Sequence, residues 1–276
     1  MKTLYSRINA GAENPFKIIH ISDTHLTYAD GRDDGRKIRL AKDRKTHFPN
    51  AEQVLSEVEK LYAETGYILV HTGDLIDFVS EANLDAARTF TKKTDCFTSA
   101  GNHEFSLYVG EAKEDSTYRE QSLEKVQNAY VNDIRFSSKI VNGINFVAVD
   151  NSYYLIEPWQ FERLKQETAK GLPVILCLHT PLYSEEAYDF ARKNEGENSP
   201  VYLMSVPEEK MQYYSPERYE QQKEDETTHT AYEFIKNEPL IKAVLTGHIH
   251  CDFELPLGDK MQYGAGCEDI RIIDIY

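Results

Sequence analysis

A chain of 276 residues, 41% of them hydrophobic, is long enough to bury one large core or two modest ones. Its 46 acidic residues outnumber its 31 basic residues, and the net charge of −15 argues against a general affinity for nucleic acid or anionic membranes. The four cysteines form no C-x-x-C pair, which argues against a disulfide framework and a cysteine zinc site and predicts reduced, mostly buried thiols.

The amino-terminal segment contains no apolar stretch of the length that a signal peptide or a membrane anchor needs. We therefore expect a cytoplasmic protein without a membrane partner. Glycines and prolines are spread along the chain, without a linker or an internal repeat. This organisation predicts a single domain over residues 1–276, with an insertion at about 183–230 that could form a cap.

Short runs rich in Ile, Val and Leu alternate with longer segments of helical character, taken here in chain order. The runs predict buried strands at 16–22, 67–73, 95–100, 144–150, 173–179 and 242–247. Helices are predicted at 49–66, 81–93 and 157–171. A hairpin turn is predicted at 141–144, and two or three further strands follow residue 251. The alternation predicts an α/β sheet whose reactive groups gather where strands end.

Polar motifs follow five of these strands. They are Asp23-Thr24-His25, Gly73-Asp74-Leu75-Ile76-Asp77, Gly101-Asn102-His103-Glu104, the isolated His179, and Gly247-His248-Ile249-His250. Carboxylate and imidazole together suit zinc, manganese and iron, and the D-x-H and H-x-H spacings let two side chains face the same way.

The candidate donors are too many for one four- to six-coordinate ion that also binds water. They are Asp23, His25, Asp74, Asn102, His179, His248 and His250. Two ions that share a bridging carboxylate would use the whole set, and paired metals are a known arrangement for phosphoryl transfer.

Each motif alone has an ordinary structural explanation. Asp23 could cap a helix or form an Asx turn, Gly73-Asp74 could be a strand-to-helix turn, and His179 could be a polar strand end. Five independent coincidences in one order are far less probable than a dinuclear site. Asp77 is expected to support a ligand or cap a helix, and Glu104 to orient its neighbours.

The five motifs, in this order, resemble the pattern of the calcineurin-like metallophosphoesterase superfamily. The resemblance spans Asp23 to His250 and implies two packed mixed β-sheets flanked by helices, a four-layer αββα sandwich. It implies that Asp74 bridges two ions of manganese, iron or zinc, and that a hydroxide between them attacks phosphorus. It implies one metal at Asp23, His25 and His250, the other at Asn102, His179 and His248, and a catalytic role for His103 in stabilising charge or protonating the leaving oxygen.

At two positions the chain departs from the patterns of particular subfamilies of this superfamily. Ser99-Ala100 stands where protein serine/threonine phosphatases place an arginine before the G-N-H-E motif, and Asp77 stands where purple acid phosphatases place a tyrosine ligand. The sequence from Ile21 to Leu26 most resembles the branch that contains cyclic-nucleotide and glycerophosphodiester phosphodiesterases.

Several residues outside the motifs are left unassigned or open. His20, His47, His71 and His229 are not assigned to metals, although His47 or His229 could approach the substrate from a loop, and Cys251 is expected to be a buried bystander. Residues 28–48 read as a charged loop, solvated or in contact with phosphate through Arg32, Arg36, Lys37 and Arg39. The tyrosines of 183–230 could stack on a nucleobase or pack within an amphipathic helical excursion.

These patterns predict metal-dependent hydrolysis of a phosphomonoester or a small phosphodiester, with a small phosphorylated substrate as the partner. Two alternatives stay open: a protein of the same fold that binds without catalysis, and a nuclease of the same superfamily, which would need a local basic track. The ligand set does not separate a phosphatase from a phosphodiesterase.

Overall fold

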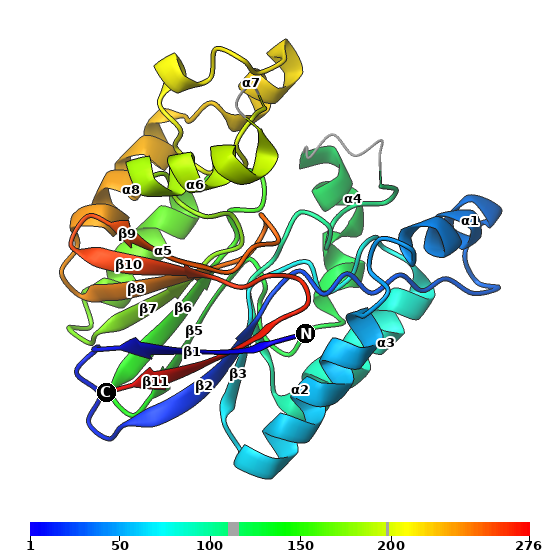
Figure 1. Cartoon of the computed structure of the whole chain (residues 1–276), viewed down its shortest axis with the longest axis horizontal. Helices are drawn as coiled ribbons and strands as arrows, with labels where there is room; N and C mark the ends of the chain where they lie inside the picture. The colour runs from blue at the N-terminus through cyan, green and yellow to red at the C-terminus, as the bar shows by residue number, and fades with distance from the viewer. Residues whose placement is uncertain (110–115, 197–198) are drawn as a thin grey trace.

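The computed structural model describes residues 1–109, 116–196 and 199–276, and its strands form two mixed β-sheets (Figure 1). The first sheet has the order β1-β11-β2-β3-β4, with bounds Thr3–Ile8, Ile270–Ile275, Phe16–Ile21, Ile68–His71 and Phe97–Thr98. The second has the order β5-β6-β7-β8-β10-β9, with bounds Phe136–Val141, Ile144–Val149, Val174–Cys177, Ile241–Thr246, Lys260–Gly264 and Phe253–Leu257.

Eight α-helices lie in the described ranges. They are α1 (Gly35–Arg44), α2 (Ala51–Thr65), α3 (Glu81–Thr94), α4 (Ser116–Gln127), α5 (Pro158–Thr168), α6 (Glu185–Glu195), α7 (Pro216–Gln222) and α8 (Glu226–Asn237), with a 3-10 turn at Glu208–Lys210. Among the residues that the structure describes, no helix is long and apolar enough to cross a membrane.

Three clusters of buried apolar side chains hold four layers together. One cluster lies between the sheets and includes Ile18 of β2 and Ile175 of β7. A second packs α2 and α3 on the outer face of the five-stranded sheet, and a third packs α5 and α8 on the outer face of the six-stranded sheet (Figure 1). Burying one side chain such as Ile18 contributes about 1.5–3 kcal/mol. The four-layer αββα arrangement that the resemblance implied is therefore confirmed.

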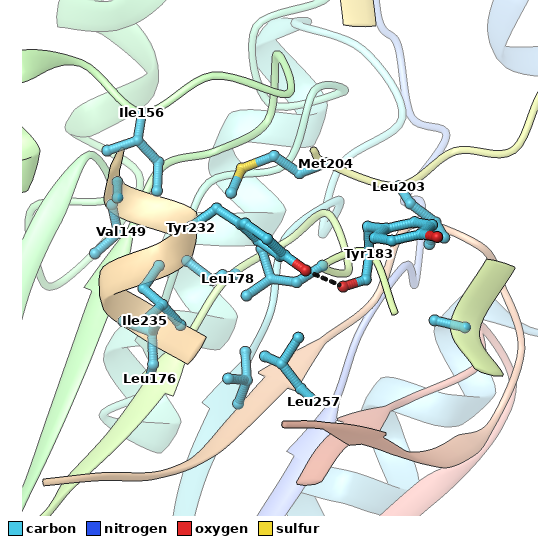
Figure 2. Close-up of a cluster of buried hydrophobic side chains, with 14 of the residues drawn as sticks. Val149, Ile156, Leu176, Leu178, Tyr183, Leu203, Met204, Tyr232, Ile235 and Leu257 are labelled. Atoms are coloured by element: carbon cyan, nitrogen blue, oxygen red, sulfur yellow. Dashed lines mark hydrogen bonds between the residues drawn. The ribbon is translucent and has the colours of Figure 1, made fainter. Parts of the chain in front are cut away.

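Figure 2 shows the third cluster, where α8 meets the six-stranded sheet and the start of segment 183–230. Tyr232 of α8 is buried in the same cluster as Leu176 of β7, and its hydroxyl donates a hydrogen bond to the carbonyl oxygen of Tyr183 at 2.9 Å. Leu203 and Met204 join the same cluster. The beginning of the insertion is thus fixed to α8. Residues 197–198 of the insertion lie outside the described residues.

Most predicted elements are confirmed, with shifts of a few residues. The predicted strand at 95–100 is only two residues long in β4, and the carboxyl end forms three further strands, β9 to β11. The hairpin joins β5 to β6 antiparallel, and Asn142 (φ 47°) and Gly143 (φ 80°) both have the positive φ that a two-residue turn of this kind requires.

Several elements were not predicted, among them α4, β1 and α1. β1 pairs with β11 in parallel, and α1 forms where the sequence suggested a charged loop. The helix begins at a good cap, because the Asp34 carboxylate accepts hydrogen bonds from the backbone N–H groups of Arg36 and Lys37.

The topology brings the polar motifs together. β2, β3 and β4 are parallel neighbours in the first sheet, and β6, β7 and β8 are parallel neighbours in the second. The carboxyl ends of parallel strands lie at the same edge of a sheet, so the loops after β2, β3, β4, β7 and β8 meet there.

Candidate metal centre

The loops that carry the motifs have an unusual backbone. Of the nine non-glycine residues with positive φ among those described, five are predicted metal ligands. They are Asp23 (53°), His25 (49°), Asp74 (60°), His248 (69°) and His250 (52°). Residues other than glycine rarely adopt this backbone conformation, which costs on the order of 1–3 kcal/mol at each position. Such strain typically persists where the surroundings and function require it.

A buried carboxylate holds two of these loops together. Glu104 accepts backbone hydrogen bonds from Asp74 (2.7 Å), Leu75 (2.8 Å) and Gly101 (2.7 Å), and a fourth from the Tyr130 hydroxyl (2.9 Å). Burial, followed by the charge of Asp74, raises the pKa of Glu104 to about 7. Because all four contacts donate to its oxygens, we assign Glu104 as an ionised acceptor that orients its neighbours, the role expected from the sequence.

Three predicted ligands of one metal meet at the edge of the cluster. His25 Nε2 lies 3.1 Å from His250 Nε2, and Asp23 Oδ1 lies 3.5 Å from His250 Nε2 and 3.9 Å from His25 Nε2. These atoms form one of the groups that could hold a metal ion. His25 and Asp23 are fully buried, whereas His250 is exposed.

The predicted ligands of the other metal meet beside them. His179 Nε2 lies 3.0 Å from His248 Nδ1, 3.2 Å from Asn102 Oδ1 and 3.3 Å from Asp74 Oδ2. Asp74, His179 and His248 also form a group that could hold a metal ion.

Asp74 lies between the two groups. Its Oδ2 atom is 3.3 Å from His179 Nε2 and 3.7 Å from His25 Nε2. Its other oxygen, Oδ1, accepts a hydrogen bond from the backbone N–H of His103 at 2.8 Å. The carboxylate is therefore placed to serve both groups, as a bridging ligand must.

The donor chemistry fits two cations. His25 Nδ1 lies 3.0 Å from the Asp77 carboxylate, and His179 Nδ1 lies 2.7 Å from the carbonyl oxygen of Thr72. These contacts assign the hydrogen to both Nδ1 atoms, so that both Nε2 atoms can offer a lone pair to a bound cation. Bonds of about 2.0–2.2 Å to a metal place neighbouring donor atoms about 3.0–3.5 Å apart, which matches most distances in the two groups.

His103 lies beside both groups. Its Nδ1 is 2.7 Å from the carbonyl oxygen of Asp77, so that its other nitrogen is left for the cavity. Burial lowers the pKa of His103, but the Asp74 charge and the Asp77 carboxylate outweigh burial and raise that pKa to about 10. Cations bound to Asp74 would cancel part of this effect and leave the contribution of Asp77. His25, Asp74 and His103 also form a third group with metal-binding geometry.

Comparison with known proteins agrees with this geometry. A family profile described as calcineurin-like phosphoesterase matches residues 16–252. The chain belongs to this family. Members of the family hydrolyse phosphoesters with bound metal ions, and the Asp and His groups described above agree with divalent ions in this chain.

A solved structure shares the fold of this family member. A dimetal phosphatase from Danio rerio is 12% identical, with 92% of this chain and 88% of that chain covered and a TM-score of 0.54. Phosphopantetheinyl hydrolase from Mycobacterium tuberculosis is 13% identical, with 91% and 90% covered and a TM-score of 0.46. A search of curated proteins returns no match.

The unassigned histidines belong to none of the metal groups found among the described residues of this phosphoesterase. His20 Nε2 bonds the hydroxyl of Thr72, and His71 Nε2 bonds that of Thr24, both inside the protein. Burial lowers the pKa of His71 to about 3. His47 and His229 are exposed.

The four cysteines are free, as expected. Cys96 and Cys177 are buried, and burial raises their thiol pKa values. Cys251 and Cys267 are only half-buried, so the expectation of a buried Cys251 is wrong in degree. Cys251 lies in the loop between β8, which ends at Thr246, and β9, which begins at Phe253.

Residues that support the ligands were partly missed from the sequence. The supporting role of Asp77 was expected, but its partner Arg44, the Phe48 ring over His25 and the Tyr154 hydroxyl beside His248 were not. The three lie outside the family motifs, and no local pattern marks them. Only the tertiary fold brings them to the cluster.

A cavity of about 270 Å³ opens over the metal groups. It is lined by Asp74, Asn102, His103, Glu195, Tyr202, His248, Ile249 and His250. Segment 183–230 therefore reaches the mouth through Glu195 and Tyr202. The Tyr202 ring lies edge-on to His248, with centroids 6.0 Å apart.

Other tyrosines of that segment are engaged in packing. Tyr188 is buried, and its hydroxyl donates to the carbonyl oxygen of Lys210. Tyr214 exchanges hydrogen bonds with the backbone of Val201. Tyr202 is thus the tyrosine of this segment placed among the cavity-lining residues described.

Two of the basic residues named in segment 28–48 have partners of their own. Arg32 pairs with Asp30 and Asp85, each at 2.7 Å, and Arg36 lies over the Tyr108 ring with 4.0 Å between Cζ and the centroid. The residues that line the cavity include no lysine or arginine. A phosphate contact through these residues therefore stays a prediction without support in the cavity lining.

Proposed function

We propose that this protein hydrolyses a phosphomonoester or a small phosphodiester with two ions of manganese, iron or zinc. The observation that carries the proposal is the position of Asp74 Oδ2, within 4 Å of imidazole nitrogens from both groups and beside the cavity. Bound metals would supply Lewis acidity and lower the pKa of a water molecule towards neutrality. Asp23, His25 and His250 would hold one ion, and Asn102, His179 and His248 the other.

The chain's own contribution to the chemistry is a fixed donor beside the reacting phosphoryl group. His103 is held by its backbone N–H on Asp74 and by its Nδ1 on Asp77. Its ring lines the cavity and can stabilise developing charge or protonate the leaving oxygen.

The cavity favours a small substrate. Its volume is about 270 Å³, and its lining carries the carboxylate of Glu195 and no lysine or arginine. A polyanionic chain of phosphates would find no cationic track among these lining residues. One phosphoryl group bound by the metals, with a compact leaving group, fits better.

The test uses the full chain stripped with a chelator and reloaded with Mn²⁺. We expect turnover of p-nitrophenyl phosphate, bis-p-nitrophenyl phosphate or both, and the ratio of the two rates separates a phosphatase from a phosphodiesterase. His103→Ala is expected to lower kcat by about 10²–10⁴-fold, the usual contribution of a general acid, while both Mn²⁺ ions stay bound. Lys60→Ala, at an exposed residue of α2, is the control.

Other outcomes would point elsewhere. If the Mn²⁺-loaded protein hydrolysed neither ester, and His103→Ala changed nothing on a broader phosphoester panel, a binding protein of the same fold would be the better account. Loss of one Mn²⁺ in His103→Ala would make His103 a ligand.

A further inference from the structure

We propose that residues 35–48, which comprise α1 and the turn that follows it and are named here the α1 arm, hold His25 in position and strengthen one of the two metal sites selectively. Arg44 and Phe48 are the positioning residues. This inference rests on the proposed function, because it assumes that His25 binds a metal.

Arg44 reaches the cluster through a buried carboxylate. Its Nε lies 2.7 Å from Asp77 Oδ2 and its Nη2 lies 2.8 Å from Asp77 Oδ1, which is the two-point geometry of a strong guanidinium–carboxylate pair. Asp77 is fully buried, and its Oδ1 also accepts the hydrogen bond from His25 Nδ1 at 3.0 Å. Arg44 therefore fixes the carboxylate that fixes the ring and tautomer of His25.

Phe48 covers the face of the same imidazole. The rings of Phe48 and His25 are stacked, with centroids 4.0 Å apart and planes 13° apart. The Phe48 ring also meets His250 edge-on at 5.7 Å, and Arg44 Cζ lies 5.1 Å above the Phe48 ring. The α1 arm thus restrains His25 both at the Nδ1 atom and over the face of the ring. The same arm contacts His250 through Phe48.

The other metal group has different supports. His179 Nδ1 bonds the carbonyl oxygen of Thr72, and His248 Nε2 bonds the Tyr154 hydroxyl. Asn151 Oδ1 accepts a hydrogen bond from the backbone N–H of His179 at 3.0 Å. None of these supports belongs to the α1 arm, so the effect of the arm should fall on one site.

The experiment measures Mn²⁺ binding by calorimetry on the chelator-stripped full chain, independently of turnover. In Arg44→Met we expect one of the two dissociation constants to rise by about 10–100-fold, the usual effect of losing a residue that orients a metal ligand. Arg44→Lys keeps the charge without the two-point fork and should give a smaller rise, and Phe48→Leu should also weaken that site. Lys42→Met, an exposed change on the same helix, should leave both constants unchanged.

Two backgrounds identify the affected site. In His248→Ala the remaining site is that of His25, and adding Arg44→Met should weaken it by about 10–100-fold. In His250→Ala the remaining site is that of His179, and adding Arg44→Met should change its constant less than about twofold, because the arm contributes none of its supports. Thermal unfolding in chelator checks that each variant folds. Should a variant fail to fold, Arg44→Lys and Phe48→Leu carry the comparison.

The failures are distinguishable. If the unmodified protein binds no Mn²⁺, the proposed function fails. If it binds two ions and Arg44→Met leaves both constants unchanged, or weakens both equally, the inference about the α1 arm fails while the proposed function stands.

Discussion

At the scale of single residues, Tyr154 supports the metal group of His179 and His248, as Arg44 supports that of His25 and His250. It is fully buried, and its φ of 62° is a conformation that bulky side chains avoid. Its hydroxyl lies 2.8 Å from His248 Nε2, while His248 Nδ1 faces His179. If Nδ1 presents its lone pair to a metal, Nε2 carries the hydrogen and donates it to the Tyr154 oxygen.

We predict that Tyr154→Phe weakens one Mn²⁺ site by about 10–100-fold, because His248 loses the partner that fixes its tautomer. Calorimetry in the His250→Ala background, where the site of His248 remains, measures the change. Tyr213→Phe, at a half-exposed tyrosine, serves as the control. An unchanged constant in Tyr154→Phe would mean that the strain at this residue has another cause.

At the scale of elements, the close contact between two strand-end loops sets the geometry of the cluster. The His248 N–H donates to both oxygens of Asp23, at 3.0 and 2.9 Å, so that the loop after β8 lies against the loop after β2. Gly247 allows this approach, since a Cβ at that position would lie 1.8 Å from Ser22 Oγ and 2.3 Å from Asp23 Oδ2.

We therefore predict that Gly247→Ala lowers the free energy of unfolding by about 1–3 kcal/mol, the usual cost of overpacking, and also weakens the metal site of Asp23. Chemical denaturation and Mn²⁺ titration measure the two effects. Gly31→Ala introduces a methyl group with no atom within 4 Å and should change neither quantity. If Gly247→Ala behaved like Gly31→Ala, the two loops could separate without loss of stability or of metal affinity.

The separation in sequence between contacting residues explains which parts of the fold and of the site could be predicted. β7 is a continuous apolar run, β2 is rich in Phe and Ile, and the D-x-H and H-x-H motifs closely follow strands, so local pattern was enough. α1 contains few apolar residues and makes its decisive contact with Asp77, 33 positions away in the chain. Tyr154 and His248 are 94 positions apart. No periodicity in the sequence encodes such pairs.

At the scale of the whole molecule, the metals and the fold are thermodynamically linked. The chain carries a net charge of −15, and the cluster gathers the buried carboxylates of Asp23 and Asp74 with left-handed backbone at five ligand positions. Cations that bind this arrangement only in the folded state stabilise it. At a free metal concentration 100 times Kd, each site would contribute about 2.7 kcal/mol.

We predict that Mn²⁺ raises the Tm of the chelator-stripped protein by roughly 10 °C or more, because two such sites together add about 5 kcal/mol and a large domain gains about 2–4 °C per kcal/mol. Differential scanning calorimetry at several Mn²⁺ concentrations measures the shift, which should grow with the logarithm of concentration above Kd. Asp74→Ala removes the carboxylate that both sites share, so it should abolish most of the shift, whereas Lys60→Ala, at an exposed residue of α2, should retain it in full. If the stripped and Mn²⁺-saturated proteins unfolded at the same temperature, the cluster would bind metal no better folded than unfolded, and the strained ligand loops would need an explanation other than metal binding.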